Sequence, residues 1–564
     1  MPMKRVARAT LCLLLAVLML TGCGNVADNG PTTQPSTQPS TQPTTVPTEP
    51  VFDVDARIQE IAKLGSSPED NYGVWYEIFV YSFCDSNGDG IGDLQGVISK
   101  LDYLQNMGVT GIWLMPIHPS TSYHKYNVRD YYDIDPAYGS LDDFQTLMAE
   151  CDKRNIKVIL DLVVNHSGSD HPWFRELCQY LTTVPSDMQY VSADECPYVD
   201  YYHINTTGGT GYNRIEGTDF FYECQFSADM PDLNLASEGL RAEIRKIMAF
   251  WIDKGVAGFR LDAAKEFYSG NAEKNIEVLR FLQETVESIK PDAYMVAEVW
   301  DSFGTITQYY KSGITSIFNY AFGNAGGKII SVIRGAGNEN VVPGYAQALE
   351  KADKAYLANH PDYIDAPFLS NHDCGRIAGF AGRDENKTKL AGAMNILMSG
   401  AAFVYYGEEL GMVAGANDDP SKRAPMVWTD DGSGGMTGTP PGCTLPESYP
   451  FGSLAQQQED PYSVYNYYRQ AIAIRNAIPA ISHGRTTAEV ALNIGCISAQ
   501  RKTWGEEECI ILMNINTENG EADLSAYADW TLAATLSVAD EEPAMDGSVL
   551  KMPAFSIAVL LPKK

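Results

Sequence analysis

The chain has 564 residues, of which 45% are hydrophobic and 20% charged, and it contains 48 glycines and 30 prolines. This composition excludes a disordered, collagen-like or small disulfide-stabilised protein, and the length is sufficient for a large α/β barrel with additional domains. The formal net charge of −31 repels polyphosphates, so nucleic acid is not an expected ligand. The 32 tyrosines, 20 phenylalanines and 8 tryptophans include flat faces suited to stacking on sugar rings.

The N-terminus has the pattern of an export signal. Lys4, Arg5 and Arg8 precede an apolar run over 11–20, which is too short to span a bilayer. The run ends in LTGC at 20–23, which resembles a bacterial lipobox, so we expect a lipoprotein signal peptide over 1–22 and a lipid on Cys23. Ordinary signal cleavage near the same place is the alternative. The lipid predicts an extracellular protein, anchored to the outer face of a bacterial cell membrane.

Residues 23–50 form a tract rich in proline, threonine and glutamine. Prolines at this density favour extended polyproline II, so the tract is expected to act as a tether of roughly 80 Å at about 3.1 Å per residue. The chain has 11 cysteines but no CxxC pair and no Cys/His metal spacing, which gives no support for zinc or redox chemistry. One disulfide among Cys178, Cys196 and Cys224 is compatible with their spacing.

From residue 74 onward, short β-rich apolar runs alternate with helical patterns, as in parallel βαβ units. Helical spacing is clear over 94–107, where apolar residues recur every three or four positions and Gly108 follows as a stop. Eight expected strands predict a closed (β/α)8 TIM barrel of the α/β class. They are 74–81, 111–115, 158–163, 257–261, 294–299, 315–318, 366–370 and 403–406.

Two segments interrupt this alternation. The stretch 167–234 is too long for an ordinary loop and predicts a loop-rich domain inserted after the third strand. After about residue 479, short strands separated by polar turns predict a C-terminal antiparallel β-sandwich. The expected order is therefore barrel over 51–166, inserted domain over 167–234, barrel over 235–479 and sandwich over 480–564.

Four polar motifs end expected strands, which is where barrel active sites are built. They are DLVVNH at 161–166, GFRLDAAK at 258–265, AEVW at 297–300 and FLSNHD at 368–373. In order and kind they resemble the signature regions of the α-amylase family of glycoside hydrolases. The resemblance extends to MPDLN at 230–234, YHKYNVRDY at 123–131, GEELG at 407–411 and RAPMVW at 423–428, and it covers the chain from about residue 74.

Retaining hydrolysis of a glycoside needs an ionised carboxylate and a protonated carboxyl about 5 Å apart. The resemblance implies that Asp262 is the nucleophile, Glu298 the general acid and then base, and Asp373 the third carboxylate, which holds sugar hydroxyls. Arg260 shares a strand face with Asp262, so it is placed to keep that carboxylate ionised. Close carboxylates are expected to raise the pKa of Glu298.

The same resemblance implies four further residues that contact substrate, alongside Arg260. His166 and His372 are expected to bind sugar hydroxyls and Tyr126 to stack beneath the ring in the cleaved subsite. Lys265 is expected to hydrogen-bond the sugar on the leaving side. A lone histidine is more often structural, and it is the adjacent motif residues that favour the functional interpretation here.

Residues 85–93 read DSNGDGIGD, with oxygen side chains at every second position around glycines. Such spacing wraps a hard cation, although the glutamate that usually occupies position 12 of an EF-hand loop is replaced by Gly96. In the α-amylase family this segment binds calcium. The resemblance therefore implies a structural calcium ion held by Asp85, Asn87, Asp89, Asp93 and the carbonyl of Ile91.

Several activities are compatible with these motifs, because fold alone does not set function. The residues AAK at 263–265, which follow Asp262, resemble the residues at this place in α-amylase family members that act on α-1,4 bonds. This resemblance predicts endo-hydrolysis of α-1,4 bonds in starch and malto-oligosaccharides. The MPDLN segment at 230–234 is also compatible with a neopullulanase-like activity. A 4-α-glucanotransferase, which would use the same site, is a further alternative. A non-catalytic starch-binding surface protein is the alternative of another class, disfavoured because Asp262, Glu298 and Asp373 are all present. The oligomeric state is not indicated by the sequence.

Overall fold

The computed structural model describes residues 52–66, 69–185 and 191–563. The expected signal peptide, linker and lipidated Cys23 lie outside these residues. Within them, no helix combines the length and the apolar character needed to cross a bilayer.

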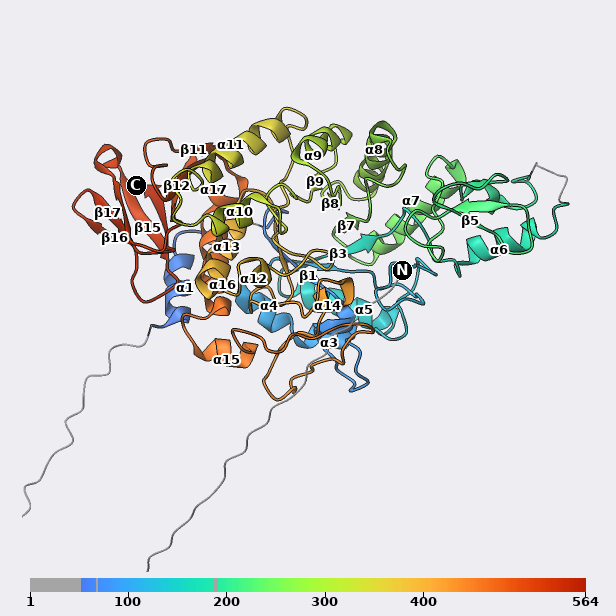
Figure 1. Ribbon diagram of the computed structural model, residues 1–564, viewed down its shortest axis with the longest axis horizontal. Helices are drawn as coiled ribbons and strands as arrows, with labels where there is room; N and C mark the ends of the chain where they lie inside the picture. Colours follow the sequence, from blue (N-terminus) through green and yellow to red (C-terminus); the bar gives the residue numbers. More distant parts are fainter. Residues whose placement is uncertain (1–51, 67–68, 186–190, 564) are drawn as a thin grey trace, which may run out of the picture. The chain divides into compact units, whose positions relative to one another are not determined.

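A parallel sheet curls around the centre of the protein in the order β10-β1-β2-β3-β7-β8-β9 (Figure 1). Aromatic side chains fill its interior, where Trp75 stacks on Tyr294 at 4.9 Å between ring centroids. The strands are β1 (Val74–Ile78), β2 (Gly111–Leu114), β3 (Lys157–Leu162), β7 (Gly258–Leu261), β8 (Tyr294–Ala297), β9 (Ser316–Ile317) and β10 (Ala402–Tyr405). The predicted TIM barrel is confirmed.

Two expected strands differ from the structure by more than two residues. The first ends at Ile78 instead of residue 81, and α2 (Val80–Phe83) follows it. The prediction was wrong here because a short buried apolar run does not by itself distinguish a strand from a helix. The expected strand 366–370 is reduced to a bridge between Ala366 and Phe318. Pro367 has no N–H to donate, yet its carbonyl accepts from Phe403 N at 2.8 Å, so this segment still closes the barrel between β9 and β10.

Helices cover the outside of the barrel. The predicted helix over 94–107 is divided at Lys100 into two, and Gly108 ends the second with a φ of 84°, which glycine adopts without strain. The principal helices are α3 (Leu94–Ser99), α4 (Leu101–Met107), α5 (Leu141–Asp152), α7 (Glu238–Asp253), α8 (Ala272–Ile289), α9 (Phe303–Tyr309), α10 (Lys328–Arg334), α11 (Gly344–Leu357), α13 (Glu385–Ile396) and α16 (Val464–Ala477). Further helices are α1 (Val54–Ala62), α12 (Ile377–Phe380), α14 (Asp419–Lys422), α15 (Leu454–Glu459) and α17 (Pro479–His483).

The insertion after β3 contains regular elements as well as loops. Helix α6 (Pro172–Leu181) precedes a small antiparallel sheet in the order β4-β6-β5, formed by Ile204–Asn205, Phe221–Glu223 and Tyr212–Arg214. A bridge from His166 to Asp232 joins the two ends of the insertion, and a bridge from Tyr202 to Leu233 joins its middle to its end. The insertion therefore returns beside the end of β3, where the candidate site begins.

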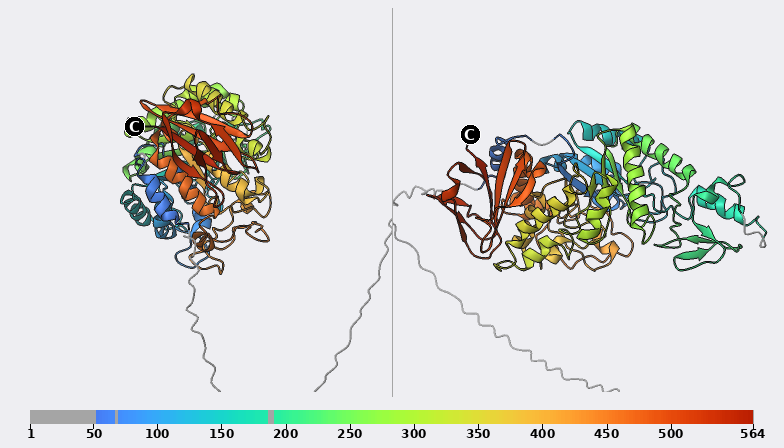
Figure 2. Two further views of the ribbon diagram at one scale, coloured as in Figure 1. Left: turned by 90° about the vertical axis from the view of Figure 1, so that its left-hand side faces the viewer. Right: turned by 90° about the horizontal axis from the view of Figure 1, so that it is seen from above.

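Two antiparallel sheets form the C-terminal region (Figure 2). Along β13, Ile510 and Leu512 pack between the two sheets, while Ile511 and Met513 face the barrel core, as the two-residue period of a strand requires. The larger sheet has β11 (Arg485–Ala488), β12 (Ile497–Trp504), β13 (Glu507–Asn514), β18 (Ile557–Pro562) and β15 (Trp530–Leu536); the smaller has β14 (Gly520–Asp523), β17 (Val549–Met552) and β16 (Ala544–Asp546). The predicted sandwich is confirmed.

All nine cysteines of the described residues are free thiols, including Cys178, Cys196 and Cys224. The disulfide that their spacing allowed does not form in the structure.

Candidate active site

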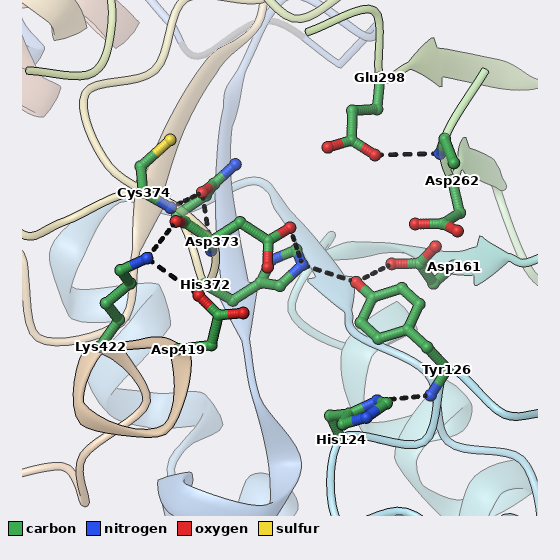
Figure 3. Close-up of polar contacts among 12 residues, drawn as sticks. His124, Tyr126, Asp161, Asp262, Glu298, His372, Asp373, Cys374, Asp419 and Lys422 are labelled. Atoms are coloured by element: carbon green, nitrogen blue, oxygen red, sulfur yellow. Dashed lines mark hydrogen bonds and ion pairs between the residues drawn. The ribbon is translucent and has the colours of Figure 1, made fainter. Parts of the chain in front are cut away.

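A cavity of about 660 Å³ lies at the carboxyl ends of the barrel strands. Asp262 follows β7 directly and Glu298 follows β8, while Asp373 comes from the segment that closes the barrel. Figure 3 shows the three carboxyl groups facing one space. Of the eight residues expected to act on substrate, six line this cavity: Tyr126, His166, Asp262, Lys265, Glu298 and Asp373.

Arg260 lies behind the cavity wall and is fully buried. Its Nη1 donates to Asp262 Oδ1 at 2.7 Å and its Nη2 to Glu298 Oε2 at 2.9 Å, so the two carboxyls share one guanidinium. Nη1 also donates to Asp161 Oδ1 at 2.8 Å. The structure thus brings Arg260 to the carboxylates, as its position in the strand predicted, and away from direct contact with the cavity.

Burial controls the protonation of the two carboxyls. It raises the pKa of Glu298 above its ordinary value although Arg260 lowers it, and the charges of Asp262 and Asp373 add to the increase. The expected effect of neighbouring carboxylates is present but comes second to burial. Burial likewise outweighs Arg260 at Asp262, whose pKa is raised, so the arginine limits that increase without reversing it.

The backbone beside Asp262 also contacts Glu298. Ala263 N donates to Glu298 Oε2 at 3.0 Å, and Tyr320 Oη donates to Oε1 at 3.3 Å. Ala263 has a φ of 46°, an uncommon conformation for a residue with a side chain. These contacts fix the orientation of the Glu298 carboxyl toward the cavity.

A buried ion network holds Asp373. His372 Nε2 lies 3.0 Å from Asp373 Oδ2 and His372 Nδ1 lies 2.7 Å from Glu77 Oε1, while Arg423 Nη2 donates to Asp373 Oδ1 at 2.8 Å. Burial alone would lower the pKa of His372, but the carboxylates of Asp373 and Glu77 raise it to about 9. Burial would raise the pKa of Asp373, but the charges of His372 and Arg423 hold it well below its ordinary value. Asp373 is therefore ionised.

Tyr126 and the two histidines occupy different positions. Tyr126 Oη lies 2.8 Å from His372 Nε2 and donates to Asp161 Oδ2 at 3.1 Å, and its ring stacks on His372 (Figure 3). His372 is fully buried and does not line the cavity, whereas His166 does. His166 Nε2 is buried and has no hydrogen-bond partner among the described residues, and burial lowers the pKa of this histidine to about 4. A neutral His166 with a vacant nitrogen suits a sugar hydroxyl.

Lys265 lies at the rim of the cavity. Its Nζ donates to Asp301 Oδ2 at 3.2 Å and to the carbonyl of Trp300 at 3.3 Å. The Trp300 ring is 44% exposed and stacks on Tyr320 at 5.3 Å. Phe226 also lines the cavity, is 53% exposed and lies 5.6 Å from the His166 ring.

The sequence alone predicted no function for Trp300, Phe226, Glu77 or Arg423. Trp300 and Arg423 lie inside quoted motifs, and Glu77 is the one charged residue of an otherwise apolar strand, a signal that was available. Phe226, in the inserted domain, carries no local signal.

Residues 85–93 form a loop of side-chain to backbone turns. Asp85 Oδ1 accepts from Asn87 N and Gly88 N, Asn87 Oδ1 accepts from Asp89 N, and Asp89 Oδ1 accepts from Ile91 N. The oxygen donors suit calcium chemically, but no three Asp, Glu, His or Cys side chains converge as a metal site anywhere in the described ranges. Asp93 is buried, where it accepts from Ser86 and caps α3. The calcium site stays a prediction.

Known proteins resemble the chain over most of its length. The family description "Alpha amylase, catalytic domain" matches residues 77–484. Alpha-amylase 3 of Dictyoglomus thermophilum is 39% identical over 450 residues, which cover 78% of this chain and 84% of that protein. An oligo-1,6-glucosidase of Parageobacillus thermoglucosidasius is 28% identical over 528 residues, covering 78% and 90%. Among solved structures, Amy13B of Eubacterium rectale has 43% sequence identity and a TM-score of 0.86, covering 90% of this chain and 99% of its own.

Proposed function

Because the chain belongs to the α-amylase family of glycoside hydrolases, we propose that it cuts internal α-1,4 bonds of starch and malto-oligosaccharides with retention of configuration. The observation that carries the proposal is the pair Asp262 and Glu298, which share the Arg260 guanidinium at the wall of one cavity. Double displacement requires two carboxyls at one cavity, of which one donates a proton. Burial raises the pKa of Glu298, as suits the proton donor, and Arg260 limits the increase that burial causes at Asp262.

Each proposed role follows from the contacts of the residue. Asp262 bonds to the anomeric carbon as the glycosidic bond breaks, and Glu298 gives its proton to the leaving oxygen. Glu298, now ionised and stabilised by Arg260 and Ala263 N, then takes a proton from water, which displaces Asp262 from the sugar. Asp373 stays charged throughout and binds hydroxyls of the same ring.

The proposed α-1,4 specificity is supported by a sequence motif, whereas an exposed aromatic ring at the cavity supports a second activity. AAK at 263–265 is similar to enzymes acting on α-1,4 bonds, and the relative with the higher identity carries the name α-amylase. Trp300 beside Glu298 is an exposed aromatic face on which a second sugar can stack, which favours glucan transfer as the second candidate activity. Transfer and hydrolysis differ only in whether a sugar hydroxyl or water resolves the intermediate.

The test is a time course of products from maltoheptaose and from pullulan. The proposal predicts mixed short maltodextrins from maltoheptaose and little from pullulan, and Asp262→Asn is expected to lower turnover by about 10³-fold or more while maltoheptaose still binds. Asp102→Asn, an exposed substitution on α4, is the control. Longer oligomers would favour transfer, panose a neopullulanase-like activity, and binding without turnover in the native protein would contradict an enzyme.

We further propose that Cys23 carries a lipid that anchors the protein to the outer face of a bacterial membrane. The proposal is supported by LTGC at 20–23 after an apolar run and by the proline-rich tract that follows. Cell fractionation of Cys23→Ser tests it. The variant is expected in the soluble extracellular fraction and the native protein with membranes, whereas equal distribution of the two would contradict anchoring.

A calcium ion held by Asp85, Asn87, Asp89, Asp93 and the carbonyl of Ile91 is proposed as a structural partner. Its support is the oxygen chemistry of these residues and the glycines at 88 and 90, whose φ values of 83° and 91° let the loop turn tightly. The ion would stiffen the segment after β1 and takes no part in the reaction.

A further inference from the structure

Three aromatic rings form a stack where the barrel meets the C-terminal sheets. Tyr72 precedes β1, His483 ends α17, and Trp504 ends β12 at the tip of a hairpin. The Tyr72 and His483 rings lie 4.1 Å apart at 22°, and the His483 and Trp504 rings lie 4.4 Å apart at 29°. Three segments distant in sequence therefore build one continuous pile of rings.

The middle ring of the stack is held on both edges. His483 Nε2 lies 2.6 Å from Asp70 Oδ2, and His483 Nδ1 lies 2.9 Å from Ser482 Oγ. These bonds hold the plane of the imidazole on which the indole stacks. Trp504 remains 44% exposed although it stacks on His483, so part of the indole is an apolar surface in contact with solvent. A preorganised ring loses little freedom when a ligand binds.

This surface is distinct from the candidate active site. Tyr72 lies two residues before β1 begins at Val74, at the amino end of the barrel. The catalytic cavity is built from residues that follow the carboxyl ends of β7 and β8, and none of the three stacked residues lines it. A ligand on Trp504 would therefore occupy a second site on the enzyme.

The polar groups around the stack favour a neutral ligand rich in hydroxyls. Asp70 is half exposed, and its carboxylate, which accepts from Tyr72 N and contacts His483, keeps further acceptor capacity for hydroxyl donors. Glu506 and Glu507 follow Trp504 in the hairpin and are exposed. These acidic groups repel a polyanion but accept hydrogen bonds from sugar hydroxyls.

We propose that Trp504, supported by His483 and Tyr72, is a secondary binding site for an α-glucan chain, with Asp70 as a hydroxyl acceptor. The choice of ligand rests on the proposed function, since the polymer is the one whose bonds the catalytic cavity cuts. The site keeps the enzyme on an insoluble glucan while the cavity acts on a chain nearby, and it contributes nothing to the cleavage of short soluble chains.

Adsorption to insoluble starch tests the proposal. In a protein carrying Asp262→Asn, which prevents turnover, Trp504→Ala is expected to weaken adsorption about tenfold, the loss of one good stacking contact. Trp504→Phe is expected to retain most of the binding. Val490→Ala, which removes another exposed apolar side chain of the same domain, is the matched control and should adsorb like the parent.

Two further measurements distinguish a binding role of Trp504 from a packing role, and a failure of this proposal from a failure of the proposed function. With Asp262 intact, Trp504→Ala should cleave maltoheptaose at the native kcat/KM, while a failure of the native enzyme to cleave maltoheptaose would count against the proposed function alone. Unchanged adsorption of Trp504→Ala would overturn the site, as would a lowered Tm with native adsorption, which would identify the stack as a domain contact only.

Discussion

A buried carboxylate that does not touch the cavity, Glu77, sets the charge next to Asp373. Glu77→Gln removes one of the two carboxylates that raise the pKa of His372 to about 9. The pKa of His372 is then expected to fall toward its ordinary 6.5, so at pH 8 the imidazolium beside Asp373 is lost. We predict that kcat/KM at pH 8 falls about tenfold relative to its value at pH 6, as expected when the pKa of His372 lies about one unit below pH 8.

The pH profile of kcat/KM checks this prediction, and Glu408→Gln is its control. Glu408 is also a fully buried glutamate near the end of β10, but its oxygens contact Ser370 and Tyr468 and not His372. The control should keep the native profile. A Glu77→Gln profile that falls equally at all pH values would mean that Glu77 acts through packing and not through the charge of His372.

The residues that carry the proposed chemistry were predictable because each lies in a short motif at a strand end. Asp262, Glu298 and Asp373 were named in this way. The contact of Glu77 with His372 was not, because it joins positions 295 apart in the chain and depends on closure of the barrel. Periodicity describes neighbours along one element, so partners across the barrel require the fold itself.

Among the elements, the loop 85–93 makes the most testable contribution to stability. If it holds calcium, removing the ion with a chelator is expected to lower Tm by about 3 °C, since a ligand that binds only the folded state stabilises that state. Asp89→Asn keeps the oxygen that accepts from Ile91 N but loses the charge, and should abolish most of the response.

Asp431→Asn is the matched control for this prediction, because Asp431 Oδ1 also accepts from a nearby backbone N–H, that of Ser433, on an exposed turn. It should respond to the chelator as the native protein does. An unchanged native Tm after chelation would contradict a structural ion in the loop.

Element boundaries were less predictable than element order. The apolar run after Val74 changes from strand to helix at Val80, and the strand expected over 366–370 is interrupted by Pro367. Both errors occur where the chain leaves or closes the barrel. Hydrophobic pattern reports burial there, but tertiary hydrogen bonds decide the conformation.

In the molecule as a whole, the C-terminal sandwich meets the barrel through a buried cation. Lys502 on β12 donates to Ser399 Oγ at 3.0 Å and to Ile481 O at 2.9 Å, with Cys509, Arg475, Asp353 and Asp365 as its ionisable neighbours. Burial lowers the pKa of Lys502 from 10.5 to about 7. At pH values between about 7 and 10.5, Lys502 is protonated in the unfolded chain and neutral in the folded protein, so folding releases a proton. The free energy of unfolding therefore increases as the pH rises from about 7 to 10.5.

Lys502→Met removes this dependence. The difference in unfolding free energy between the variant and the native protein is expected to favour the variant by about 2 kcal/mol more at pH 6 than at pH 9. The reason is that the folded native protein must bury the Lys502 charge at pH 6 but not at pH 9. Thermal unfolding at both pH values measures the difference. A difference independent of pH would show that Lys502 keeps its ordinary pKa in the interface.

In the proposed mechanism Asp262 attacks the sugar, and water activated by Glu298 resolves the resulting intermediate. The most direct test is proton NMR of the products in the first minutes of maltoheptaose cleavage, before the anomers equilibrate. Two successive displacements at the anomeric carbon predict that the new reducing ends appear first as the α-anomer. Initial accumulation of the β-anomer would contradict the account, because it would mean a single displacement by water without a covalent bond to Asp262.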